Sequence, residues 1–109
     1  MVPRAEQLAE EAASLAQAVQ ALASLTRSPQ ERLDRALSYF GRTFRDAPAG
    51  AALAHYQRVY AILGNPPVGT PIACRLDTLS PAEQDELPTV LCALAAEITR
   101  QALDAERAA

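Results

Sequence analysis

The sequence contains no tryptophan and no lysine, and its 109 residues include one histidine and two cysteines. A zinc site needs about four cysteine, histidine or carboxylate ligands in a set spacing, and these residues do not supply such a set. A nucleophilic relay needs a base beside a serine or cysteine, and neither a second histidine nor a G-x-S-x-G turn is present. We therefore expect no catalytic residue, no metal and no cofactor.

Long apolar runs are also missing. No stretch approaches the roughly 20 apolar residues that span a bilayer, and Glu6, Glu10 and Glu11 interrupt the one segment placed like a signal peptide. The expected location is the cytoplasm, where Cys74 and Cys92 stay reduced. All basic residues are arginine and alanine is abundant, which is typical of a GC-rich bacterial genome. The net charge of −3 argues against general binding of polyanions.

Two short patterns mark helix starts, SPQE at 28–31 and SPAE at 80–83. In each, the serine caps the first turn, the proline fits the first helical position, and the glutamate closes a capping box. With the apolar periodicity they predict an all-α fold, an antiparallel four-helix bundle that forms one domain over residues 1–109. The expected helices cover about 3–26, 29–46, 49–64 and 81–107.

The segment before the last helix is rich in proline and glycine. Residues 65–79 are expected to form a long loop, which either crosses along the bundle or has a functional role. Within the last helix, Pro88 lacks an amide donor and disfavours helical geometry at Leu87. We therefore expect a kinked C-terminal helix with a break near 87–88.

The first helix carries a seam of alternating small and large apolar side chains at helical spacing. The seam consists of Leu8, Ala12, Leu15, Val19 and Leu22. Such a seam admits close approach of another helix, from the same chain or from a second copy. Because only 5% of the residues are aromatic, one chain buries little apolar area. We favour packing of this seam inside one chain, and self-association of these residues in a homodimer is the other prediction.

The second helix is strongly amphipathic. Leu33, Leu37, Phe40 and Phe44 recur on one side. The other side, called the arginine face below, consists of Arg32, Arg35, Tyr39, Arg42 and Arg45. Residues 27–58 hold six arginines against three acids, a net charge of +3, whereas residues 59–109 have three arginines against seven acids, a net charge of −4. The arginine face is our predicted binding site for an acidic protein partner. Weak nucleic-acid binding is the alternative, although only Tyr39 offers a stacking platform.

The single histidine, His55, lies in the stretch LAHYQRVYAILGN at 53–65. The His-x-x-basic pattern of His55 and Arg58 resembles that of histidine phosphotransfer domains, which are four-helix bundles that carry a phosphate on histidine. In that motif a glycine follows the basic residue and leaves room for a response regulator, whereas this chain has Val59. We therefore favour the interpretation that His55 lies at the margin of the packed face and bonds to a backbone carbonyl. A phosphotransfer role stays the alternative.

These observations predict a non-catalytic protein–protein interaction module, such as an accessory subunit, an adaptor or a small chaperone-like protein. The prediction rests on the missing catalytic chemistry, the seam of the first helix and the arginine face of the second.

Overall fold

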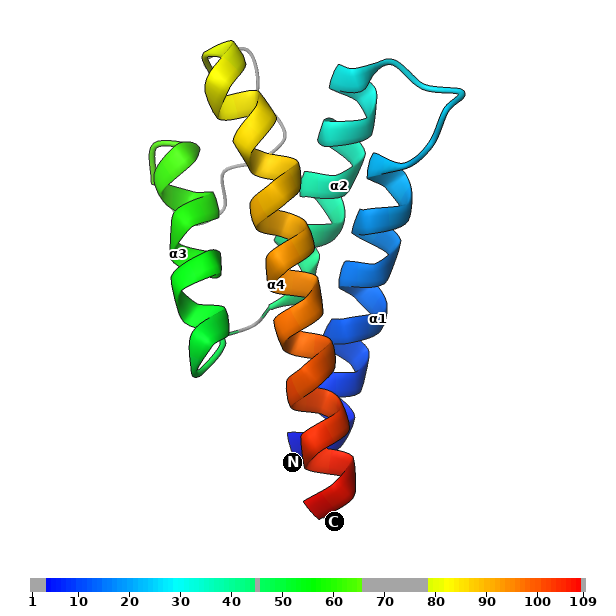
Figure 1. Cartoon of the computed structure of the whole chain (residues 1–109), viewed down its shortest axis with the longest axis vertical. Helices are drawn as coiled ribbons and strands as arrows, with labels where there is room; N and C mark the ends of the chain where they lie inside the picture. The colour runs from blue at the N-terminus through cyan, green and yellow to red at the C-terminus, as the bar shows by residue number, and fades with distance from the viewer. Residues whose placement is uncertain (1–3, 45, 66–78, 109) are drawn as a thin grey trace.

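The computed structural model describes residues 4–44, 46–65 and 79–108, and these ranges contain only helices as regular structure (Figure 1). The helices are α1 (Arg4–Leu22), α2 (Pro29–Thr43), α3 (Ala51–Ile62) and α4 (Pro81–Ala108). The helix α1 packs against both α2 and α4, and α3 packs against α4. Figure 1 shows α4 between α3 and α1, with both ends of the chain at the same end of the molecule. The all-helical fold is confirmed, and no described helix is long and apolar enough to cross a membrane.

Both predicted helix starts are found. The Ser28 hydroxyl accepts a hydrogen bond from the Glu31 amide at 3.2 Å, with Pro29 in the first turn of α2. At the start of α4 the capping box is reciprocal, because the Ser80 hydroxyl accepts from the Glu83 amide at 3.2 Å and the Glu83 carboxylate accepts from the Ser80 amide at 3.0 Å. These bonds satisfy amides that lack partners within the helix.

Helices α1, α2 and α3 are shorter than the periodicity indicates. Thus α1 ends at Leu22 rather than near residue 26, and the Ser24 amide donates to the Ala21 carbonyl three residues back in a tightened last turn. The helix α2 ends at Thr43 rather than 46, because Phe44 takes an extended conformation. Gly50, with φ at +65°, delays the start of α3 from 49 to Ala51.

The Gly64-Asn65 pair ends α3. The Asn65 amide donates to the Tyr60 carbonyl at 2.8 Å, and the Gly64 amide donates to the Ala61 carbonyl at 3.1 Å. Both residues have positive φ, and this bonding pattern is a Schellman motif. The remainder of the predicted 65–79 loop, residues 66–78, lies outside the described residues, as do Arg45 and Cys74.

The expected break near 87–88 does not occur. The helix α4 runs from Pro81 to Ala108 with Pro88 inside it. Proline removes one hydrogen bond, to the Gln84 carbonyl, but packing on either side holds the helix together. Leu87 is 0% exposed and Leu91 is 1% exposed, so continuity of the helix keeps both side chains in the core. At about 1.5 Å per residue its 28 residues span roughly 42 Å, which sets the 43 Å length of the molecule.

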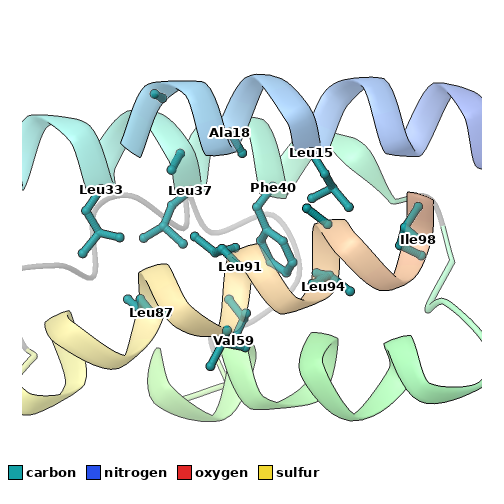
Figure 2. Close-up of a cluster of buried hydrophobic side chains, with 14 of the residues drawn as sticks. Leu15, Ala18, Leu33, Leu37, Phe40, Val59, Leu87, Leu91, Leu94 and Ile98 are labelled. Atoms are coloured by element: carbon teal, nitrogen blue, oxygen red, sulfur yellow. The ribbon is translucent and has the colours of Figure 1, made fainter. Parts of the chain in front are cut away.

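The core lies where α1, α2 and α4 meet, and α3 closes one side. Figure 2 labels ten of its members: Leu15 and Ala18 of α1, Leu33, Leu37 and Phe40 of α2, Val59 of α3, and Leu87, Leu91, Leu94 and Ile98 of α4. All ten are between 0% and 5% exposed. The predicted apolar side of α2 is therefore its buried side, except that Phe44 is only half-buried.

An aromatic cluster of Phe40, Phe44, Tyr56 and Tyr60 joins α2 to α3. The ring centroids of Phe40 and Tyr60 are 5.5 Å apart, and those of Phe44 and Tyr56 are 5.4 Å apart in an edge-to-face arrangement. Burial, followed by a hydrogen bond with Tyr56, raises the pKa of Tyr60 to about 12. Large rings thus connect two helices whose backbones do not pack closely.

Candidate functional site

The arginine face lies on the solvent side of α2. Arg35 and Arg42 are exposed, whereas Arg32 and Tyr39 are half-buried. The Tyr39 ring packs against the core cluster, and the Arg42 guanidinium lies over it at 5.2 Å from the ring centroid. The structure thus brings four of the five predicted residues onto one helix face. The fifth, Arg45, lies outside the described residues.

Backbone carbonyls orient two of these arginines. The Arg42 Nε donates to the Ser38 carbonyl at 3.1 Å, and the Arg32 Nε donates to the Arg27 carbonyl at 2.9 Å. The second bond ties the start of α2 to the α1–α2 connection. In both residues the remaining guanidinium nitrogens form no ion pair with a described residue. Each side chain is therefore held in place while its charge is left available.

Arg58 of α3 and Arg100 of α4 contrast with the arginines of α2, because both form ion pairs. The Arg58 Nε lies 2.5 Å from the Glu86 carboxylate, so α3 is joined to α4 by an ion pair. Arg100 binds Glu97, and its Nη1 lies 2.7 Å from the Asp104 carboxylate. Glu31 and Asp34 lie on the same helix as Arg32 and Arg35, yet no ion pair joins them. Within the described ranges, four arginines without an ion pair therefore lie on α2 and its preceding turn, against two unpaired acids there: Arg27, Arg32, Arg35 and Arg42, with Glu31 and Asp34.

The predicted self-association seam is used inside the chain. Leu8 and Leu15 are 3% and 1% exposed, and Ala12, Val19 and Leu22 are half-buried against the same core. The side chains that were predicted to meet a second copy thus already contact α2 and α4. Among the described residues, the large apolar side chains that stay exposed are Leu25, at 88%, in the turn after α1, and Leu103, at 48%, on α4. Self-association through the seam stays a prediction without an exposed apolar surface to support it.

His55 is half-buried on α3, as the margin interpretation expects, but it makes no hydrogen bond with another described residue. The hydrogen bond from Arg100 is the main reason that the pKa of Glu97 is lowered, and the charge of His55 acts in the same direction. Val59 is 0% exposed, so the steric objection to a docking regulator is wrong: this side chain faces the core and not solvent.

The sequence-based reasoning did not identify two features of α1. Glu11 is a charged residue 5% exposed at a core position, and burial raises the pKa of its carboxyl against the effects of Arg4 and of a hydrogen bond with Gln7. Glu11 lies four residues before Leu15 on the seam side of α1, and this spacing is the feature of the sequence that indicates its burial. The other feature is the hydrogen bond from the Thr43 hydroxyl to the Ser14 hydroxyl at 2.9 Å, which sets the register of α1 against α2.

Comparison of the chain with protein-family models, curated proteins and solved structures found no match. Among the described residues, no three cysteine, histidine or acidic side chains come together in a way that would hold a metal ion.

Proposed function

We propose that this protein is a non-catalytic protein–protein interaction module, an accessory subunit, adaptor or small chaperone-like protein, whose arginine face binds an acidic protein surface. The observation that carries the proposal is the contrast between helices. Arg58 and Arg100 pair with carboxylates, whereas Arg32, Arg35 and Arg42 gather on one face without such a partner. An acidic surface supplies the missing counter-charges.

The composition of this face suits an interface. Arginine and tyrosine are enriched among residues that dominate binding energy, because they combine a planar, partly apolar body with several hydrogen-bond donors. Arg42 stacked on Tyr39 joins both types in one ordered unit. Because the Tyr39 ring is anchored in the core cluster, little side-chain entropy remains to be lost when a partner binds.

The proposal includes the antiparallel arrangement of the bundle. The Ser14–Thr43 contact lies roughly 12 Å from the end of α1 and roughly 21 Å from the start of α2 along their axes. If the two helices ran parallel, the connection from Leu22 to Pro29 would have to span about 33 Å, whereas seven residues reach at most about 25 Å. Opposite directions leave only about 9 Å to cross, which supports an antiparallel pair.

The test is to capture binding partners from the host with the purified protein and to repeat each interaction with the purified candidate. Arg35→Glu combined with Arg42→Glu reverses two exposed charges on the face and is expected to abolish binding. Arg107→Glu is the matched control, because Arg107 is exposed on α4 and forms no ion pair with a described residue. Unchanged helicity by circular dichroism shows that the fold is retained. Binding that survives the double substitution contradicts the proposed site.

A phosphotransfer role for His55 is a second candidate, favoured by one observation. Since Val59 is buried, the surface beside His55 and the exposed Arg58 is not blocked by that side chain. Incubation with a small phosphodonor or a histidine kinase is expected to produce an acid-labile phosphate that His55→Gln removes. The absence of such a label contradicts this candidate and leaves the interaction module unaffected.

A further inference from the structure

Two exposed acids on α1 lie on the same side of the molecule as the arginine face. Glu6 and Glu10 precede Ser14 by eight and four residues, so the three side chains follow one line along α1. Ser14 is the residue that accepts the hydrogen bond from Thr43 of α2. The line of acids therefore continues beyond the end of α2. Neither Glu6 nor Glu10 forms an ion pair with a described residue.

The acids and the arginines are placed at matching distances from this contact. Glu6 lies eight residues before Ser14, and Arg35 lies eight residues before Thr43. At about 1.5 Å per residue, each is roughly 12 Å from the contact, and with α1 and α2 antiparallel the two lie in opposite directions from it. Glu10 and Arg42 lie closer to the contact, about 6 Å and about 1.5 Å away on the same two sides. The α1 half therefore carries Glu6 and Glu10, and the α2 half carries Arg35 and Arg42, with the exposed Glu31 one turn before Arg35.

We infer that a second copy of this chain docks on this surface by a twofold axis near the Ser14–Thr43 contact, so that Glu6 and Glu10 of each copy meet Arg35 and Arg42 of the other. This inference rests on the proposed function and names its acidic partner. A twofold pairing places equal offsets opposite each other, and the same patch serves both copies. The remaining difference of about 4.5 Å between the Glu10 and Arg42 offsets is within the reach of an arginine side chain.

A second copy fits this surface better than an acidic partner that contacts the arginines alone. In such a dimer the arginines of each copy face the acids of the other, so Glu6 and Glu10 of both copies have a partner of opposite charge. Two exposed side chains of this surface, Ala13 and Ser38, are small, which favours close approach of two helix layers. The apolar seam of α1 is not required, because it is buried inside each chain. In Figure 1, α3 and α1 lie on opposite sides of α4, so α3 does not cover α1.

The first measurement is the native mass of the full chain by light scattering over a range of concentrations. The mass is expected to rise toward twice the 11.6 kDa of one chain, and the dimer is expected to weaken as salt is added because exposed charges are screened. Arg35→Glu with Arg42→Glu places acids on both halves, and Glu6→Arg with Glu10→Arg places arginines on both. Each double variant is expected to weaken the dimer at least about tenfold, and Arg107→Glu is expected to leave it unchanged.

Mixing the two double variants is the decisive step. At positions 6, 10, 35 and 42 one copy then presents only acids and the other only arginines, so a one-to-one heterodimer is expected where neither variant dimerises alone. The same result shows that both variants are folded. A wild-type chain that stays monomeric at every concentration, or variants that do not pair on mixing, overturns the inference. If a different protein still binds and Arg35→Glu with Arg42→Glu abolishes that binding, the proposed function stands while the second copy is excluded as the partner.

Discussion

The uninterrupted path of α4 through Pro88 predicts that this proline destabilises the folded chain. In the structure the residue at 88 lies in the eighth position of a 28-residue helix, where a proline has no amide to donate to the Gln84 carbonyl and its ring crowds that carbonyl. Alanine at this position supplies the missing donor. The substitution Pro88→Ala is therefore expected to strengthen the helix.

The magnitude follows from opposing contributions. The difference in helix propensity between proline and alanine in a helix interior is about 3 kcal/mol. Pro88 is half-buried, so losing its ring offsets about 1 kcal/mol of that gain. Loss of the restriction that proline places on the unfolded chain offsets up to about 1 kcal/mol more. The net expectation is an increase of about 1–2 kcal/mol in the free energy of unfolding.

Urea denaturation followed by circular dichroism measures this change, and Pro81→Ala is the matched control in the same helix. Pro81 occupies the first helical position, where no amide bond is lost and the fixed φ of proline is favourable. Its replacement is expected to leave stability unchanged or to lower it slightly. If Pro88→Ala stabilises the chain no more than Pro81→Ala does, α4 is not continuous at this position.

Three further results are expected from stability and titration measurements. Burial raises the pKa of Glu11 above its ordinary 4.5, so its contribution to stability is present below that value and is lost as the pH rises through the raised pKa. The free energy of unfolding of Glu11→Gln should therefore exceed that of the wild type by about 1 kcal/mol at neutral pH but not in acid. A difference that is the same at all pH values contradicts this prediction. Gly50→Ala should cost about 1–3 kcal/mol because φ is +65°, whereas Gly41→Ala in the exposed last turn of α2 should add about 0.5 kcal/mol. Ultraviolet titration should show one tyrosine that ionises at about 12, and Tyr56→Phe should lower that pKa. Because the raised pKa belongs to the folded state, the wild type should lose stability as the pH rises from 10 to 12, and Tyr60→Phe should not show this loss.

Local signals predicted the helices well, because helix caps and apolar periodicity act within a few residues. Ser28 and Ser80 cap their helices through bonds to residues three positions ahead, and the apolar side of α2 follows from its spacing alone. The prediction of a break at Pro88 was wrong because contacts between distant parts of the chain decide the outcome there. Local geometry disfavours a helix there, but Leu87 and Leu91 bury their side chains only if the helix continues, and the sequence does not show what they pack against.

At the candidate site, too, some features follow from local sequence signals and others do not. Exposure of Arg35 and Arg42 follows from the amphipathic pattern of α2. The lack of counter-charges cannot be deduced from it, since Glu31 and Asp34 are close in sequence yet form no ion pair with the arginines. In α3, Val59 is fully buried, whereas the rings of Tyr56 and Tyr60 are half-buried and contact Phe40 of α2. Large aromatic side chains fill the space between helices that do not pack closely, and spacing alone does not show that space.

The distribution of ion pairs distinguishes two sides of the molecule. On the side of α3 and α4, Arg58 and Arg100 each have a carboxylate within 2.7 Å, so those charges already have partners before any protein binds. On the side of α1 and α2, Glu6, Glu10, Arg35 and Arg42 are exposed and bind no opposite charge among the described residues. An exposed ion pair that exists before binding must be broken or desolvated when a partner covers it, whereas an unpaired charge can gain one. The side formed by α1 and α2 is therefore the one on which a charged partner gains most, and charge reversal there should alter binding far more than the same reversal at Arg107.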